Sequence, residues 1–289
     1  MGGPLVREPF GLPAWQHRWQ THRHGWLLLA GVLAGSSLLL LCGVALQRQL
    51  RPPAAPPPGS RQLPAPPAQA AWISPLRAQC SVNDRALVQR LNSLRQGLPQ
   101  RLQRIRIDPS NFGDRFREDA FGNRLDVIPS MVVLHETVYG LNSAINTFIT
   151  HHPNDDDQVS YHVLIGEKGQ IVQAVDPSKR AFGAGNSAFN GRWVVTNAKL
   201  SGSVNNFALH LSLETPLDGE DDGPAHSGYT AAQYDALAVV LADWMDRFNI
   251  PPEHITTHRH VDLGLERADP RSFDWQKLQS RLAALGFLC

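Results

Sequence analysis

The chain has 289 residues, with 27 Lys and Arg against 26 Asp and Glu, so its formal net charge at pH 7 is +1. Charges of both signs are mixed along the sequence, and no basic stripe interleaved with aromatic residues is present. This composition argues against a nucleic-acid-binding protein. The length is sufficient for one well-buried domain with additional segments.

Residues 26–46 form an apolar run without a charged residue. As a helix this run would cover roughly 30 Å, the thickness of the membrane hydrocarbon. It is longer than the core of a typical cleavable signal and no clean cleavage site follows, so we predict an uncleaved transmembrane helix. Cys42 lies inside the run, but Leu41 precedes it where a lipid-attachment site needs a small residue. Arginines flank the run on both sides, so charge gives little orientation bias.

Eight prolines lie between Pro52 and Pro67, mixed with alanine and glutamine. Such a segment cannot build a core, so residues 47–71 are predicted to be a linker, with residues 1–25 as a short cytoplasmic segment on the other side of the membrane. At about 3.1 Å per residue in polyproline geometry, the linker would hold a domain roughly 50 Å from the membrane as a semi-rigid spacer.

The remainder of the chain alternates predicted helices and strands. Residues 72–128 are expected to form a helical preface, in which 86–98 has the spacing of an amphipathic helix. Residues 129–289 are expected to form the main domain. It begins with a short apolar strand of buried character at 131–135, followed by a helical pattern at 141–151.

A β-hairpin is predicted over residues 159–175, with arms at 161–165 and 170–175 joined by the glycine-containing turn 166–169. Residues 207–213 alternate Leu with Ala, His and Ser. That period of two predicts a half-buried strand.

The last two predicted helices have recognisable ends. Thr230 and Gln233 form a capping box that begins a helix with an apolar stripe as far as Phe248. A final helix is predicted at 273–285, where Gly286 would end it. Long loops at 183–204 and 216–228 carry no core pattern and are expected to frame a groove. The predicted fold is α/β, a central mixed sheet flanked by helices.

Three side chains far apart in the sequence are candidate metal ligands. A histidine and an aspartate follow each other on one segment, with His258 or His260 supplying the imidazole and Asp269 the carboxylate. His135, at the end of the apolar strand, would supply a third ligand. Two imidazoles and one carboxylate are a ligand set typical of catalytic zinc, although a lone histidine at a strand end is more often a packing residue.

Two cysteines lie beyond the apolar run, Cys80 and Cys289. In an oxidising compartment such a pair suggests a disulfide between the ends of the domain, although both could stay reduced. The acidic run 155–157 lacks the spaced oxygen ligands of a calcium site and is interpreted as a solvated loop.

Six segments, in order along the chain, resemble the zinc-dependent N-acetylmuramoyl-L-alanine amidase family, which includes phage lysozyme-like amidases and peptidoglycan recognition proteins. The resemblance covers about half the chain. The segments are Leu134–Thr137, Val159–His162, Gly169–Gln173, Val204–Phe207, Tyr229–Tyr234 and His258–Trp275.

The resemblance places three Zn²⁺ ligands on His135, His258 and Asp269, and leaves a fourth position for water or the substrate carbonyl. His258 matches the family sequence better than His260 does. Tyr161 takes the place of a tyrosine beside the metal, and we assign it the proton-transfer role. Arg267 stands where the family usually has a lysine that stabilises the developing oxyanion.

In one branch of the family a glutamate on the strand 207–213 acts as the general base, and Ser212 occupies that position here. Glu214, two positions on, is expected on the same face of the strand and is held as a substitute catalytic group. His162 matches a further family histidine that lines the substrate cleft, so the resemblance implies a substrate contact there. His210 and Thr137 are further candidate substrate contacts, and His210 is also held in reserve as the general base.

The resemblance therefore implies hydrolysis of the amide between N-acetylmuramic acid and L-alanine, with peptidoglycan or a muropeptide as the substrate. The catalytic domain is expected on the periplasmic or extracytoplasmic side of the inner membrane, anchored by one N-terminal helix. The alternative is a module that binds muropeptides without cutting them. Because all three candidate ligands are present, the enzyme is favoured.

Overall fold

A six-stranded mixed sheet forms the centre of the protein in a computed structural model that describes residues 62–221 and 223–289. The strand order is β1-β5-β4-β7-β3-β8. β4 and β5 pair antiparallel, and the other neighbours pair parallel. The smaller sheet is the antiparallel pair of β2 and β6. The strands are β1 Leu102–Arg104, β2 Phe112–Asp114, β3 Met131–Glu136, β4 Val163–Ile165, β5 Ile171–Gln173, β6 Lys179–Ala181, β7 Ala208–Leu213 and β8 Ile255–Thr257.

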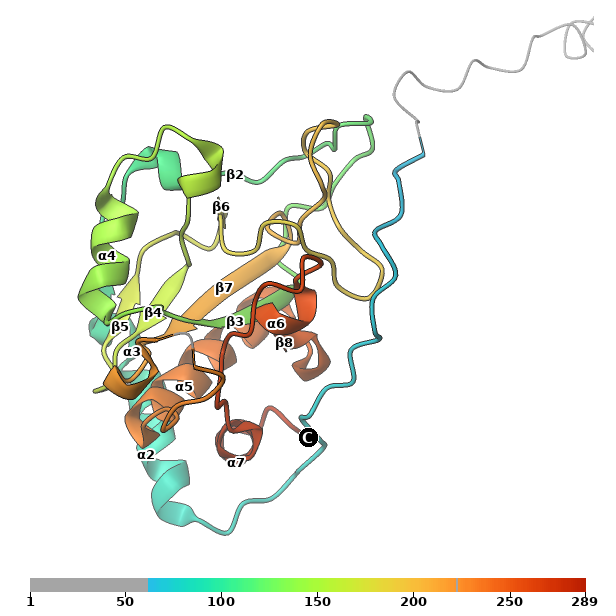
Figure 1. Ribbon diagram of the computed structural model, residues 1–289. Helices are drawn as coiled ribbons and strands as arrows, with labels where there is room; N and C mark the ends of the chain where they lie inside the picture. Colours follow the sequence, from blue (N-terminus) through green and yellow to red (C-terminus); the bar gives the residue numbers. More distant parts are fainter. Residues whose placement is uncertain (1–61, 222) are drawn as a thin grey trace, which may run out of the picture. The chain divides into compact units, whose positions relative to one another are not determined.

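Helices lie on both sides of this sheet (Figure 1). The largest core cluster joins one face of the sheet to α2, α5 and α7. On the other side, α4 packs Phe148 against Leu164 and Val172 of the sheet. The α-helices are α2 Arg85–Gln96, α3 Leu98–Arg101, α4 Leu141–Ile149, α5 Ala231–Phe248, α6 His258–Val261 and α7 Trp275–Ala284, and the 3₁₀ turns are Pro109–Asn111, Asp155–Asp157, Leu217–Gly219 and Pro252–His254. The predicted mixed sheet flanked by helices is confirmed.

The local sequence signals correspond to real elements. β4 and β5 form the predicted hairpin, in which Ile165 faces Ile171. Gly169 in its turn has a φ of 77°, a conformation that favours glycine. The capping box of α5 is present with both of its hydrogen bonds, from the Gln233 backbone to the Thr230 side chain and back.

The prediction of a half-buried β7 was wrong. All six residues of this strand are buried, including the side chains of His210 and Ser212. β7 lies between β4 and β3, and both faces of the sheet are covered. The alternation of leucine with polar residues therefore marks two different buried environments, an apolar core on one face and a polar site on the other.

Residues 72–128, predicted as a helical preface, contribute more than helices. They also supply β1, which pairs with β5 at one edge of the sheet. The helix predicted at 86–98 is confirmed as α2, whose Leu87 and Leu91 are buried in the same core as α5. This segment is therefore part of the sheet domain.

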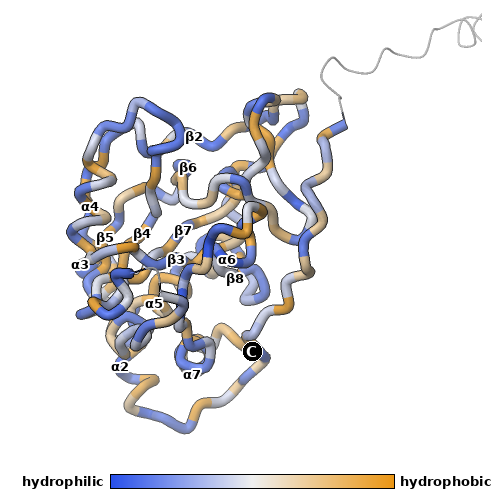
Figure 2. The backbone as a smooth tube through the Cα atoms, viewed as in Figure 1, coloured by the Kyte–Doolittle hydropathy of each residue, from blue (hydrophilic) through white to orange (hydrophobic). Residues whose placement is uncertain are grey.

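The first described residues, 62–80, run in an extended conformation along the domain, and we call them the N-terminal strap (Figures 1 and 2). The Trp193 indole N–H donates to the carbonyl of Pro64, at 2.8 Å. The Trp72 backbone N–H donates to the side chain of Asn190, at 3.3 Å. Within the predicted linker 47–71, the described residues Pro64 and Gln69 thus form hydrogen bonds with the domain.

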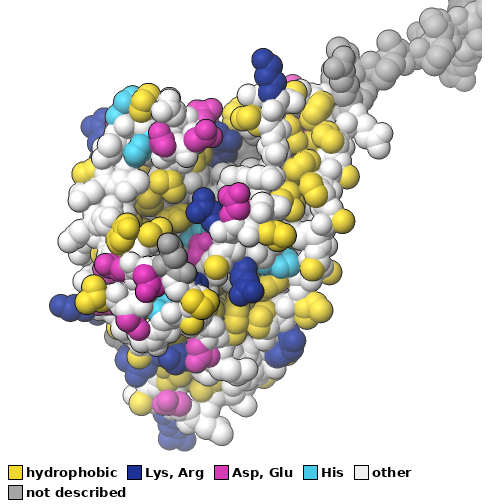
Figure 3. Space-filling view, viewed as in Figure 1, with side chains coloured by type: hydrophobic (Ala, Val, Ile, Leu, Met, Phe, Trp, Pro, Cys, Tyr) yellow, Lys and Arg dark blue, Asp and Glu magenta, His cyan; other side chains and the backbone are white. Residues whose placement is uncertain are grey.

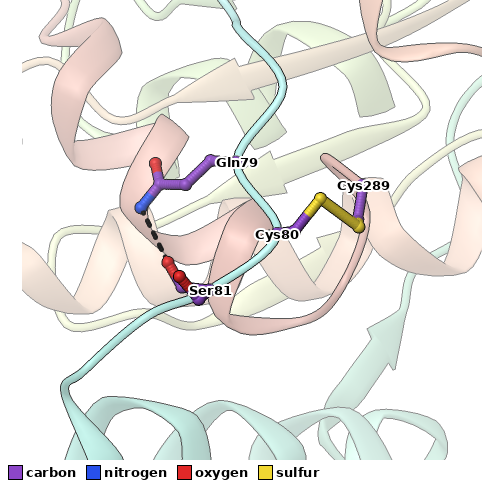
Figure 4. Close-up of a disulfide and its surroundings, with 4 residues drawn as sticks. All are labelled: Gln79, Cys80, Ser81 and Cys289. Atoms are coloured by element: carbon purple, nitrogen blue, oxygen red, sulfur yellow. Dashed lines mark hydrogen bonds between the residues drawn. A yellow bond between two sulfur atoms is a disulfide. The ribbon is translucent and has the colours of Figure 1, made fainter.

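The strap ends in a disulfide between Cys80 and Cys289 (Figure 4). Beside it, the Gln79 backbone N–H donates to the carbonyl of Leu288, at 2.6 Å. Of the two possibilities left by the sequence, the paired state is the one observed.

The predicted transmembrane helix, residues 26–46, lies outside the described residues, as do residues 1–25 and 47–61. Within residues 62–221 and 223–289, no helix combines the length and the hydropathy that a membrane crossing requires.

Candidate metal centre

His135, His258 and Asp269 come together at the carboxyl ends of two neighbouring strands. His135 is the fifth residue of β3, and His258 directly follows β8. Because β3 and β8 pair parallel, their carboxyl ends lie at the same edge of the sheet. Asp269 belongs to the loop between α6 and α7 and reaches back to both histidines.

The three side chains have the spacing of a metal site. The Nδ1 atom of His135 lies 3.2 Å from Oδ2 of Asp269, and Nδ1 of His258 lies 3.0 Å from Oδ1. One ligand atom from each residue lies within 4.8 Å of the other two. His135 is fully buried, and the side chain of Asp269 is 16% exposed. Two imidazoles and one carboxylate at this spacing fit three corners of a tetrahedral site.

The surroundings favour the protonation states that metal ligands need. Burial lowers the pKa of His135 to about 4, so its imidazole is neutral at pH 7. Burial alone would raise the pKa of Asp269, but its contacts with His135 and His258 outweigh this and hold the pKa below the usual value. Neutral imidazoles and an ionised carboxylate are the forms that bind a divalent cation.

Tyr161 and Arg267, the two residues predicted to act in catalysis beside the metal, lie near this cluster. The Tyr161 ring stacks on His135, with 4.4 Å between centroids. Burial raises the pKa of Tyr161 above its ordinary value of 10, so the phenol keeps its proton at pH 7. Arg267 is exposed on the loop before Asp269, and its positive charge acts on both His135 and Tyr161.

A comparison with known protein families gives a match over residues 125–272, which contain all three clustered residues. The matching family is N-acetylmuramoyl-L-alanine amidase. The chain belongs to this family. The matched segment runs from before β3 to the loop after Asp269, so it contains the clustered residues.

The chain is similar to curated amidases of known name. The 1,6-anhydro-N-acetylmuramyl-L-alanine amidase AmpD of Citrobacter freundii is 31% identical over 123 residues, which are 43% of this chain and 57% of that protein. AmpD of Escherichia coli K12 is 33% identical over 124 residues, which are 42% of this chain and 57% of that protein. The chain thus spans just over half the length of these relatives.

Solved structures of amidases are also similar. A selenomethionine AmpD derivative has 25% identity and a TM-score of 0.46, covering 63% of this chain and 94% of that one. The E. coli amidase AmiD, solved with anhydro-N-acetylmuramic acid-L-Ala-D-gamma-Glu-L-Lys, has 22% identity and a TM-score of 0.42, covering 59% of this chain and 65% of that one.

His260, the other histidine considered as a ligand, faces away from the cluster. Its ring lies 4.7 Å from that of Trp72 in the strap, and its backbone carbonyl accepts a hydrogen bond from Gln69. The cluster thus contains His258, whereas His260 contacts the strap.

His210 and His162 lie beneath the cluster instead of lining an open cleft. Nδ1 of His210 is 3.0 Å from Nε2 of His135. Nδ1 of His162 accepts the His210 backbone N–H, and its Nε2 faces the carbonyl of Lys179 at 3.2 Å. Burial lowers the pKa of His162 to about 3. Both imidazoles are fully buried, behind the three clustered residues.

Glu214 and Thr137 have structural partners. One carboxylate oxygen of Glu214 accepts the backbone N–H of Leu141 and the other that of Glu167, at 2.6 and 2.7 Å. The Thr137 side chain is buried and accepts the backbone N–H of Thr215 at 2.9 Å. Both side chains join loops around the site, and neither has a described hydrogen bond to the three clustered residues.

The sequence reasoning did not find Glu136. This carboxylate is 7% exposed, and it pairs with Arg271 across a sequence separation of 135 residues. Tyr229 donates its hydroxyl to the same carboxylate. The sequence did contain a signal for Glu136, because it is a charged residue that directly follows the predicted apolar strand 131–135 and the candidate ligand His135.

Proposed function

We propose that this protein hydrolyses the amide bond between N-acetylmuramic acid and L-alanine in peptidoglycan or its muropeptides, with Zn²⁺ held by His135, His258 and Asp269. The observation that carries the proposal is the convergence of these three ligands in a chain of the amidase family. When bound, zinc supplies Lewis acidity toward the scissile carbonyl and the attacking water.

The neighbouring side chains supply the remaining chemistry. Tyr161, with its proton retained by burial, acts as a hydrogen-bond donor to the reacting oxygen or the leaving nitrogen. Arg267 places a permanent positive charge at the rim of the site, where it stabilises the negative charge that develops on the carbonyl oxygen. Ser212, which faces His135 on the neighbouring strand, stands in the position of the missing glutamate.

We further propose that the domain works outside the cytoplasm, tethered by the apolar segment 26–46. Support comes from the disulfide between Cys80 and Cys289, since such bonds persist mainly in oxidising compartments. An extracytoplasmic domain held to the membrane would meet its peptidoglycan substrate directly. Labelling of a single cysteine introduced on the exposed surface of the domain, on intact cells before and after permeabilisation, distinguishes the two sides of the membrane.

The enzymatic proposal is tested with the full-length protein on purified sacculi and, separately, on anhydro-muropeptides. We expect release of free stem peptide, lost with a chelator and restored by Zn²⁺. The matched variants are His258→Ala, which should abolish release, and His260→Ala, which should retain it. Binding to sacculi with no release from either substrate would indicate the non-cutting module instead.

A further inference from the structure

We propose that the buried ion pair between Glu136 and Arg271 is a clamp that positions the metal ligands. This inference rests on the proposed function, because it concerns the same site. Glu136 directly follows His135 at the end of β3, and Arg271 lies two residues after Asp269. The pair therefore joins the two segments that carry these ligands, at points one and two residues away from them.

Arg271 is held on all sides. Its side-chain Nε and its backbone N–H both donate to the Glu136 carboxylate, the latter at 2.8 Å. Its two terminal nitrogens donate to the backbone carbonyls of Gly219, Asp221 and Gly223, at 2.6 to 2.9 Å. A guanidinium fixed by carboxylate and carbonyl oxygens in several directions has little freedom to turn.

Glu136 is equally constrained. Besides Arg271, its Oε2 atom accepts the Tyr229 hydroxyl and lies 3.2 Å from Nε2 of His226. The side chains of Glu136 and Arg271 are 6% and 10% exposed. Removing one partner would leave the other charge buried without compensation, which is far more costly than losing a surface ion pair.

The position of Asp269 relative to His135 depends on this ion pair. His135 and Asp269 are separated by 134 residues, and Asp269 lies in a loop without regular secondary structure. A loop carboxylate needs an external support to stay within bonding distance of a metal held by two strand ends. Arg271 provides that support, and through the three carbonyls it also fixes the loop around Leu217–Gly219. Arg271 thus fixes both the segment that carries Asp269 and one loop of the predicted groove.

The test is Zn²⁺ affinity, measured by chelator competition on full-length wild type and on Arg271→Met, Arg271→Lys and Glu136→Gln. We expect a loss of about 10- to 100-fold for the methionine and glutamine variants, as for other residues that orient metal ligands. Arg271→Lys should lose less, because it keeps the charge but not the forked geometry. The double variant Glu136→Gln/Arg271→Met should lose no more Zn²⁺ affinity than the weaker-binding single variant, since the two substitutions remove the same interaction.

A matched control is the buried pair of Arg281 and Asp235, whose side chains are 11% and 9% exposed and which joins α7 to α5. Arg281→Met and Asp235→Asn should lower the thermal midpoint of the metal-free protein but leave Zn²⁺ affinity unchanged. The visible spectrum of bound Co²⁺ should change for the Arg271 and Glu136 variants and not for the controls, because it reports ligand geometry.

The outcomes separate this inference from the proposed function. Wild-type Zn²⁺ affinity and an unaltered Co²⁺ spectrum in Arg271→Lys and Glu136→Gln would overturn the clamp while leaving the amidase proposal intact. Failure of the wild type to bind Zn²⁺ would overturn both. If Arg271→Met does not fold, the lysine and glutamine variants still decide the question.

Discussion

Gly183 shows how a single missing side chain shapes the site. A Cβ atom at this position would lie 2.4 Å from Nδ1 of His210, the nitrogen that faces His135. The His210 ring could not keep its position against a Cβ atom at residue 183, so the absence of a side chain at Gly183 makes room for it. The alternation of residues in β7 gives no sign that His210 needs this space.

Replacing Gly183 by alanine should therefore displace His210. We expect the Gly183→Ala variant to lose about 1–3 kcal/mol of unfolding free energy, as for other overpacked cores. Its Zn²⁺ affinity should also fall, because His135 loses its support. Gly185→Ala is the control, since a Cβ there meets no atom within 4 Å. Equal Zn²⁺ affinity in the two variants, measured by chelator competition, would contradict the supporting role of His210.

His162 should make the metal-free protein sensitive to acid. Burial lowers the pKa of His162 to about 3 in the folded state, against an ordinary value of 6.5, so the unfolded chain binds the proton more readily between these limits. Its contribution to stability is complete above pH 6.5 and is lost as the pH falls toward 3. His162→Gln keeps both hydrogen-bonding functions without titrating.

The measurement is the unfolding free energy as a function of pH, in the presence of a chelator. Wild type should lose more stability than His162→Gln between pH 6.5 and 3, by several kcal/mol in total, because each unit of pKa shift corresponds to about 1.4 kcal/mol. The other buried histidines are present in both proteins, so the difference between the curves reports the replacement of His162. Parallel curves would show that His162 does not carry this dependence.

At the scale of elements, Glu214 joins the first turn of α4 to the turn between β4 and β5. It directly follows the last residue of β7. The helix begins at Leu141 without a side-chain cap from its own N-cap residue, Gly140. The Glu214 carboxylate supplies the missing acceptor for the backbone N–H of Leu141. It also accepts the backbone N–H of Glu167 in the hairpin turn. A carboxylate at a helix N-terminus is favoured by the helix dipole as well.

Glu214→Ala should therefore act on stability more than on catalysis. We expect a loss of about 1.5–3 kcal/mol of unfolding free energy from the two charged hydrogen bonds, with kcat per folded molecule within about threefold of wild type. Glu167→Ala, which removes an exposed carboxylate in the same turn, is the control. A fall in kcat of about 100-fold or more at unchanged stability would instead identify Glu214 as the general base.

At the scale of the whole molecule, the strap and the disulfide connect the first described residues to the last. Cys80 and Cys289 are 209 residues apart, so their bond closes nearly the entire domain into one loop. The strap also contacts the loop that carries Asn190 and the segment after His258.

Removing the disulfide should lower the unfolding free energy by about 2–4 kcal/mol, because a long closed loop restricts the unfolded chain. The comparison is denaturant unfolding of Cys80→Ser, Cys289→Ser and the double variant, which should be equally destabilised. Limited proteolysis at Arg77 should then become faster, as the end of the strap comes free. Unchanged stability in all three variants would show that the bond contributes little.

The sequence by itself indicated several elements and the candidate ligands. The capping box at Thr230, the turn around Gly169 and the apolar strand before His135 are local signals, and each is present as predicted because its cause lies within a few residues. The resemblance to the amidase family marked His135, Asp269 and either His258 or His260 as candidate partners.

Only the tertiary structure decided what surrounds those ligands. His258 lies in the cluster, whereas the ring of His260 contacts Trp72 of the strap. Glu214 accepts a hydrogen bond from the first residue of α4. The pairing of Glu136 with Arg271 likewise joins residues 135 positions apart. A buried polar group must find a partner, but the sequence does not state which distant group the fold will bring to it.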